Sequence, residues 1–415
     1  MNMKKKSRKM ELDVIRIVAC LMVFMLHTLI CTKQLVDFSK EGMKVWWTYT
    51  PAWGGVWIFF FLSAWFSAGV FWKEDYKYTL SNVLRFYGTK IIKIGIPSYF
   101  FTFLLIITHY TTYWTNTDIM IRLFTFRFNG IGGVDGIGAL WYISTLMQLF
   151  LLTPFLMMAI HKLFRRVKSR IVWKCLIGII VLLGLGNRLL LLKYNITWYE
   201  WIYTFSLSNL DIYICGLLCH VLCSQKKKES AGWLKWMASA GMIAVIGSNT
   251  WIYYAGDYGN ADCMMLYQYV YPSFYILALT FFTSVFHSNA PDRLEEGTER
   301  RGKRMIRTVI TRLSGYTFWF YLWHSFVLPQ IYQQIRVSGP VSTHLRLMGY
   351  TAVITLVLSI FFENAFSLLL RPMISRLKTP GGGMAGRKIL ANRRNMHFAI
   401  DKLYRVRYGM RVSFP

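Results

Sequence analysis

The stretch LDVIRIVACLMVFMLHTLIC, from Leu12 to Cys31, decides the fold class of this chain. Its 20 residues are almost all apolar, and that is the length an α-helix needs to cross a hydrocarbon core about 30 Å thick. The run KKKSRK, Lys4 to Lys9, leads directly into it without the pattern of a cleaved secretory signal. We therefore expect a signal anchor that forms the first membrane-spanning helix.

Two polar side chains, Arg16 and His27, interrupt this first span. They are eleven residues apart, and at about 100° per residue both fall within about 20° of one helix face. The rise between them is about 16 Å, so one face carries a cation near one membrane surface and a titratable imidazole much deeper. Such a face suits a polar path that ends at an acid/base group. Alternatively, Arg16 snorkels to the interface and His27 is satisfied by a neighbouring carbonyl.

The composition predicts an all-α, polytopic membrane protein. Of the 415 residues, 55% are hydrophobic and only 16% are charged, which excludes an ordinary soluble enzyme. Apolar stretches of membrane-spanning length recur along the chain. The expected spans, about ten in number, are 12–31, 52–72, 91–110, 138–161, 171–192, 200–222, 233–253, 266–287, 314–333 and 346–370.

Basic residues alternate between the loops in the pattern that sets membrane orientation. With the N-terminus placed in the cytoplasm, the cytoplasmic segments hold 33 Lys and Arg residues and the external loops hold 7. The net charge of +29 therefore follows topology and anionic membrane lipid, and nucleic-acid binding is excluded. We expect both termini in the cytoplasm, a basic N-terminus at 1–11, one membrane domain at 12–370, and a basic, partly disordered tail at 371–415.

Further charged side chains lie within the expected spans. Asp13 is three residues before Arg16 and can orient it. Arg188 and Asp211 lie in consecutive spans, where a structural ion pair is the expected arrangement. Glu363, in the last span, is expected to meet a cation or a hydrogen-bond donor.

Other residues allow both a structural and a functional interpretation. Arg85, Lys90 and Lys93 form a cationic cluster that either anchors the chain at the surface or binds phosphate. Trp141 and Tyr142 open the fourth span, where an aromatic belt is the ordinary explanation. His324 lies near mid-membrane. Cysteines 215, 219 and 223 repeat every four residues, which is typical of helix packing and not of a metal site, so no metal is expected.

These segments resemble a known family. The run LDVIRIVACLMVFMLH resembles the opening of the membrane acyltransferase-3 family, whose first span carries an arginine, ten residues and then a histidine. Six further segments resemble the family's motifs in order: FFFLSAWFSAGVFW (59–72), KIIK with a following proline (90–97), ALWYISTLMQLFLLTP (139–154), LDIYICGLLC (210–219), LSGYTFWFYLWHSFVL (313–328) and ENAF (363–366). Ala64, Lys90, Lys93 and Ala365 stand where the family pattern has glycine, two arginines and a proline.

The resemblance implies a membrane O-acyltransferase. Such proteins move an acyl group, commonly acetyl, from cytoplasmic acyl-CoA to a hydroxyl on a surface or exported polysaccharide or a lipid-linked sugar. The expected setting is the plasma membrane of a bacterium, with proteins of glycan assembly as partners. The alternatives are a transporter or flippase for a glycan or anionic solute, which would consume no acyl-CoA, and a sensory or scaffolding membrane protein.

The resemblance and the residues together suggest roles. A sugar hydroxyl needs a general base near neutral pH, and His27 is the candidate for that base or for an acyl relay. Arg16, with Arg85, Lys90 and Lys93, would hold the phosphates and pantetheine arm of the donor. The oxyanion donor is open between Ser63, Tyr142 and His324, and His324 could instead be a structural hydrogen-bonding residue.

Overall fold

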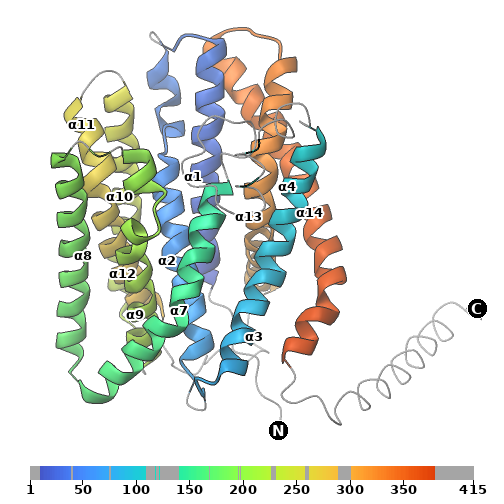
Figure 1. Ribbon diagram of the computed structural model, residues 1–415. Helices are drawn as coiled ribbons and strands as arrows, with labels where there is room; N and C mark the ends of the chain where they lie inside the picture. The colour runs from blue at the N-terminus through green and yellow to red at the C-terminus, as the bar shows by residue number, and fades with distance from the viewer. Residues whose placement is uncertain are drawn as a thin grey trace, which may run out of the picture. The chain divides into compact units, whose positions relative to one another are not determined.

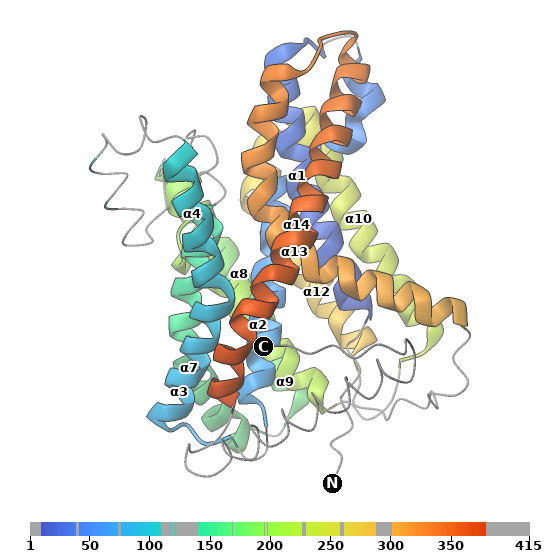
Figure 2. The same cartoon turned by 90° about the vertical axis from the view of Figure 1, so that its right-hand side faces the viewer.

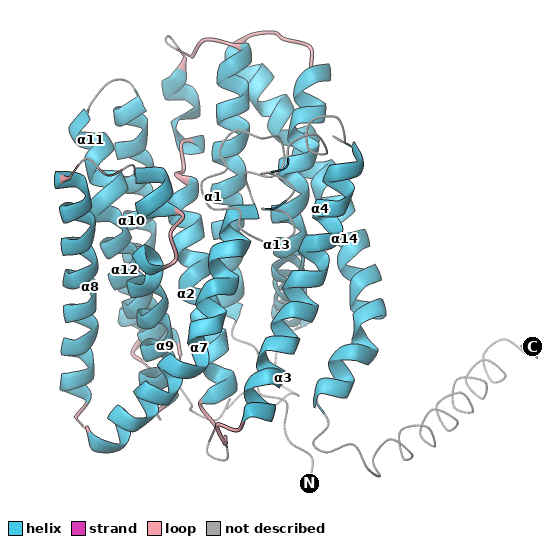
Figure 3. Ribbon diagram, viewed as in Figure 1, coloured by secondary structure: helices cyan, strands magenta, loops and turns pink. Residues whose placement is uncertain are grey.

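The computed structural model describes residues 10–38, 41–73, 76–108, 117, 121, 140–167, 169–194, 196, 198–225, 230–257, 261–287 and 301–378. Within these ranges the chain is helical, with short connecting segments and no β-strand (Figure 3). The all-α class predicted from the sequence is therefore confirmed. The chain divides into two compact units, Met1–Ser367 and Leu368–Pro415.

Two helices, α1 (Met10–Leu35) and α2 (Ala52–Phe71), form the centre of the first unit (Figure 1). Helix α1 packs against α2 and also against α13 (Arg301–Gln334). Helix α2 is apolar on every side and most of its residues are buried, as expected of a helix enclosed by others. It also contacts α7 (Trp141–Arg166), α9 (Leu210–Ser224) and α12 (Tyr271–Phe286).

The other elements surround this pair. Figure 2 shows α13 beside α1, in agreement with their extensive contacts. Helix α3, a π-helical turn η2 and helix α4 follow one another without a break. The remaining bounds are η1 (Gly42–Thr48), α3 (Leu80–Lys90), η2 (Ile91–Gly95), α4 (Ile96–Thr108), α8 (Arg170–Lys193), η4 (Trp198–Tyr203), η5 (Leu207–Asn209), α10 (Gly232–Asp257), α11 (Ala261–Met265), η6 (Leu266–Val270) and α14 (Pro340–Lys378).

Local sequence explains where several helices begin. Pro51 immediately precedes α2 and has an extended backbone conformation. Proline adopts this conformation readily and is disfavoured in the interior of a helix, so the helix begins after it. Thr79 caps α3, since its hydroxyl accepts a hydrogen bond from the Asn82 amide. Pro272 lies in the first turn of α12, where its missing N–H leaves no helical hydrogen bond unmade.

Seven helical segments of the described chain are long and apolar enough to cross a membrane. They are Met10–Leu35, Gly42–Phe71, Trp141–Arg166, Arg170–Lys193, Leu207–Ser224, Asp262–Phe286 and Pro340–Ser375. The expected spans at 91–110, 233–253 and 314–333 fall on η2 and α4, on α10 and on α13, which are outside this set. The chain is thus a multi-pass membrane protein, and the number ten stays a prediction.

The predicted ends of the chain are largely outside the described residues. The basic N-terminus at 1–11 is described only from Met10, and the basic tail at 371–415 only to Lys378, where α14 ends. The domain boundaries that the sequence predicts therefore stay predictions.

Candidate active site

His27 and His324, which lie in the first and the ninth expected span, meet. Nδ1 of His27, on α1, lies 2.8 Å from Nε2 of His324, on α13. The rings are nearly parallel, with centroids 5.0 Å apart and an angle of 17° between their planes. His324 is fully buried and His27 is partly buried. Residues 297 positions apart in the chain therefore form one imidazole pair inside the bundle.

The surroundings of His324 fix the direction of this hydrogen bond. Nδ1 of His324 lies 3.2 Å from the carbonyl oxygen of Phe320, which can only accept. In the neutral ring the proton is therefore on Nδ1 of His324, and its Nε2 accepts from Nδ1–H of His27. The Nε2 atom of His27 is then left with its lone pair, which is the state a general base requires.

Aromatic and hydroxyl groups surround the pair. The ring of Tyr321 lies 5.7 Å from that of His324, and the ring of Tyr142 lies 5.5 Å from that of Tyr321. Tyr142 is hydrogen-bonded to the hydroxyl of Ser63, on α2. Tyr142 is buried at the start of α7 instead of facing lipid as a belt residue would. Two of the predicted oxyanion donors, Ser63 and Tyr142, thus share one hydrogen bond, and the ring of Tyr321 contacts both Tyr142 and His324.

Arg16, in the N-terminal half of α1, interacts with the carboxylate of Glu363. Arg16 is close enough to Tyr142, Lys90 and Glu363 to interact with each electrostatically. Glu363, on α14, also interacts with Lys93 and is hydrogen-bonded to the side chain of Trp319. The predicted partners of Glu363, a cation and a hydrogen-bond donor, are therefore both present.

The predicted cationic cluster is split by its local contacts. Nζ of Lys90 donates to the hydroxyl of Ser67 at 2.9 Å and lies 3.8 Å from the centre of the Phe150 ring. Lys93 is exposed on the π-helical turn η2, and Arg85 interacts electrostatically with Tyr76. Lys90 and Lys93 thus interact with the group around Arg16 and Glu363, whereas the contact given for Arg85 is with Tyr76.

Asp13 ties α1 to α13. Its carboxylate is fully buried and accepts hydrogen bonds from Ser314 at 2.8 Å and Thr311 at 3.3 Å. These contacts fix the first turn of α1, which positions Arg16 one turn further along. The expectation that Asp13 orients Arg16 directly stays a prediction.

Arg188 and Asp211 form a separate buried centre. Nη2 of Arg188 donates to Asp211 at 2.8 Å and to Ser273 at 3.2 Å, joining α8, α9 and α12. The ion pair expected from the sequence is present.

Trp141 is also buried, against Tyr203 at 4.3 Å between ring centroids, and is likewise not an exposed belt residue.

Several residues around the site were not predicted from the sequence: Ser67, Phe150, Trp319 and Tyr321. Tyr321 precedes His324 by one helical turn, so the spacing of that motif was a usable signal. Ser67, Phe150 and Trp319 carry no such signal, since an isolated serine or aromatic residue in an apolar span is ordinary.

Among the described residues, no group of three or more His, Cys, Asp or Glu side chains is placed to hold a metal ion.

One comparison with known proteins succeeds. The family model described as an acyltransferase domain, of the acyltransferase-3 type, matches residues 10–363. No curated protein and no solved structure matches this chain.

Proposed function

This chain is a membrane acyltransferase that belongs to the acyltransferase-3 family, and we propose that it moves an acetyl group from cytoplasmic acetyl-CoA to a sugar hydroxyl. The acceptor would be a cell-surface or exported polysaccharide or a lipid-linked sugar. The site would operate in the plasma membrane of a bacterium, beside proteins of glycan assembly. The observation that supports this proposal best is the hydrogen bond between His27 and His324.

The pair supports a role for His27 as general base. Nε2 of His27 would take the proton of the acceptor hydroxyl while that oxygen attacks the thioester carbonyl carbon. The tetrahedral intermediate would then collapse, break the carbon–sulfur bond and release the thiolate of CoA. The proton held by His27 would pass to that sulfur, so that ester and free thiol are the products.

His324 would act as a positioning residue for this base. It accepts the hydrogen bond from Nδ1–H of His27 and so selects the tautomer whose Nε2 is unprotonated. Both nitrogens of His324 are engaged, which favours Tyr142 and Ser63 over His324 as donors to the oxyanion. A preorganised hydroxyl near a cation such as Arg16 suits that role.

The cations near the N-terminal end of α1 support an anionic donor. Arg16, Lys90 and Lys93 lie on the side that the basic loops assign to the cytoplasm. Guanidinium and ammonium groups bind phosphate through charge-assisted hydrogen bonds. Arg85, which precedes Lys90 in α3, would meet the outer part of the same ligand.

A substitution at the exposed cation tests the donor end. In Lys93→Gln we expect KM for acetyl-CoA to rise about tenfold, since one charge-assisted contact contributes about 1.4 kcal/mol or more. The maximal rate should change little. Lys174→Gln, on α8, is the matched control and should leave both constants unchanged. Equal effects of the two substitutions would contradict this donor path.

The activity itself is tested with the purified protein in proteoliposomes and [¹⁴C]acetyl-CoA. We expect release of CoA and label that is transferred to de-esterified surface polysaccharide from the source cells. A protein that binds acetyl-CoA without turnover in the presence of that polysaccharide would contradict the proposed acceptor. Movement of polysaccharide across the vesicle membrane without consumption of acetyl-CoA would replace the transferase by a transporter.

A further inference from the structure

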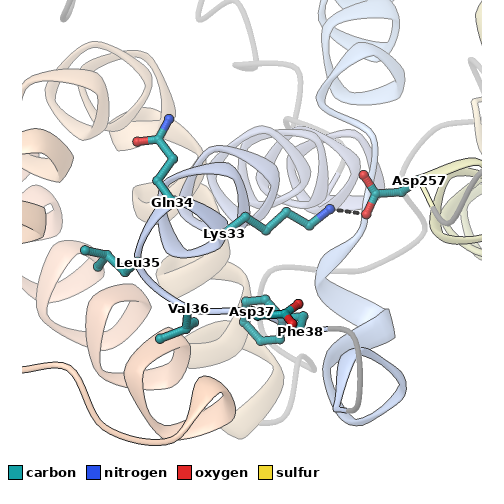
Figure 4. Close-up of a pocket in the computed structure, with 7 residues that line it drawn as sticks. All are labelled: Lys33, Gln34, Leu35, Val36, Asp37, Phe38 and Asp257. Carbon is teal, nitrogen blue, oxygen red and sulfur yellow. Dashed lines mark hydrogen bonds and ion pairs between the residues drawn. The ribbon is translucent and has the colours of Figure 1, made fainter.

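A pocket lies at the end of α1 that is opposite Arg16. It has a volume of about 500 Å³ and is lined by the last turn of α1, the segment that follows it, and the end of α10 (Figure 4). That volume falls in the range of small-molecule binding sites, roughly 300–1,000 Å³. By the distribution of basic loops, this mouth opens on the external side of the membrane.

The pocket presents polar side chains of several kinds. Lys33 is ion-paired with Asp257, and Figure 4 shows its side chain extended toward that carboxylate. Gln34 and Asp37 are exposed, and Phe38 is buried at the wall. Carboxylate, amide and ammonium groups together can both donate to and accept from neighbouring hydroxyl groups.

A row of aromatic rings leads away from Lys33 along the end of α10. Nζ of Lys33 lies 4.8 Å from the centre of the Tyr49 ring, and Tyr49 is in edge contact with Tyr254 at 5.0 Å. Tyr254 contacts Trp251 at 5.7 Å, and Trp251 contacts Trp46 at 6.2 Å. Trp251 and Trp46, at the far end of this row of ring contacts from Lys33, are 48% and 37% exposed. A ring surface next to polar groups suits a ligand that has one apolar face and several hydroxyls.

The helix itself connects this pocket to the histidine pair. Gln34 follows His27 by seven residues, which at about 100° per residue places both within about 20° of one face. The rise between them is about 10 Å. Arg16, His27 and Gln34 therefore lie in one row along α1, with the imidazole between the cationic end and the pocket.

We propose that this pocket binds the saccharide acceptor, with Gln34 and Asp37 contacting sugar hydroxyls and Trp251 packing against a sugar face. The assignment rests on the proposed acyl transfer to a sugar. It gives the two substrates opposite entrances: the donor from the basic side and the acceptor from the pocket, with His27 between them. Neither entrance would then compete with the other for one set of side chains.

Direct binding tests this proposal without relying on turnover. The probe is a set of fluorophore-labelled oligosaccharides cut from the de-esterified surface polysaccharide of the source cells, titrated onto the full chain in nanodiscs. We expect saturable binding that weakens at least about tenfold in Gln34→Ala and in Trp251→Ala. Trp236→Ala, at the other end of α10 and 79% exposed, is the matched control and should bind as the wild type does.

A second readout guards against a folding defect. Gln34→Cys should react with an external, membrane-impermeant maleimide, and the oligosaccharides should slow that reaction. Unchanged affinity in both pocket variants, or no saturable binding by the wild type, would overturn the proposal. Wild-type binding that is lost in the pocket variants, without any turnover of acetyl-CoA, would keep the pocket as a saccharide site and reject the transferase chemistry instead.

Discussion

His324 is the residue that makes one orientation of His27 preferable to the others. A histidine on a membrane helix can rotate about its side-chain bonds and exchange tautomers, and either change would turn the lone pair away from a substrate. The 2.8 Å hydrogen bond to His324, with Phe320 holding the far nitrogen of His324, removes that freedom. In the proposed mechanism His324 would therefore act through His27 and would need no contact with substrate.

Two substitutions at His324, to glutamine and to leucine, distinguish a role in orienting His27 from a role in packing alone. In His324→Gln the amide oxygen can still accept from Nδ1–H of His27, so we expect kcat to fall only about tenfold. In His324→Leu nothing accepts, and kcat should fall at least about a hundredfold. KM for acetyl-CoA should be unchanged in both. Equal loss in the glutamine and leucine variants, or a parallel loss of thermal stability, would show that His324 only fills space.

The sequence singles out both histidines, but it does not predict their contact. Helical pitch alone places Arg16 and His27 on one face, because the turn of an α-helix is fixed by backbone geometry. Whether His324 faces α1 depends on how α13 packs and rotates, over a separation of 297 residues. Ser67 beneath Lys90 is missed for the same reason, since nothing local marks a serine that meets a lysine from another helix.

At the scale of elements, the buried pair Arg188–Asp211 joins α8, α9 and α12 and leaves little room around it. A Cβ on Gly184, one turn before Arg188, would overlap the Asp211 carboxylate. The carboxylate would have to move, and it is held by Arg188 and by its own bond to the Ile212 amide. Gly186, two residues along the same helix, has no neighbouring atom within 4 Å of such a Cβ.

Alanine at these two glycines should therefore have opposite effects. Gly184→Ala should lower the free energy of unfolding by about 1–3 kcal/mol, because it overpacks a buried ion pair. Gly186→Ala should raise the free energy of unfolding by up to about 1 kcal/mol. Alanine has less backbone freedom than glycine in the unfolded chain, so less conformational entropy is lost when α8 forms. Thermal unfolding in detergent measures both. A stabilising Gly184→Ala would mean that α8 and α9 are further apart than described.

The sequence predicts well which stretches form helices. It does not predict where a helix departs from regular α-helical geometry. Apolar runs of about 20 residues mark the spans because backbone groups in lipid must be satisfied within the segment. The π-helical turn Ile91–Gly95 was not predicted. Such a turn adds one residue to a helical repeat without a compositional signal, and it changes which face carries Lys93.

At the scale of the whole molecule, the basic loops assign one membrane side to the N-terminal end of α1 and the other to its C-terminal end. The loop before α3 and the turn between α13 and α14 should therefore lie on opposite sides. This arrangement would give the proposed donor and acceptor their separate entrances. It rests on charge asymmetry alone, which is a property of the full sequence and not of any contact.

Matched serine substitutions test that orientation. In intact cells an impermeant maleimide should label Ser338→Cys above the wild-type level, since this position is exposed at the external turn. Ser81→Cys, exposed at the start of α3, should be labelled only after the cells are permeabilised. Labelling of both positions in intact cells, or the reverse pattern, would contradict the two-sided path.

Whether His27 is the base of the acyl transfer is decided by comparing two proteins. Wild type and His27→Ala are assayed side by side for transfer of [¹⁴C]acetyl groups to de-esterified surface polysaccharide and for equilibrium binding of acetyl-CoA. We predict that His27→Ala binds acetyl-CoA as the wild type does and transfers at least about a hundredfold more slowly. Transfer at the wild-type rate by His27→Ala would show that His27 is not the base.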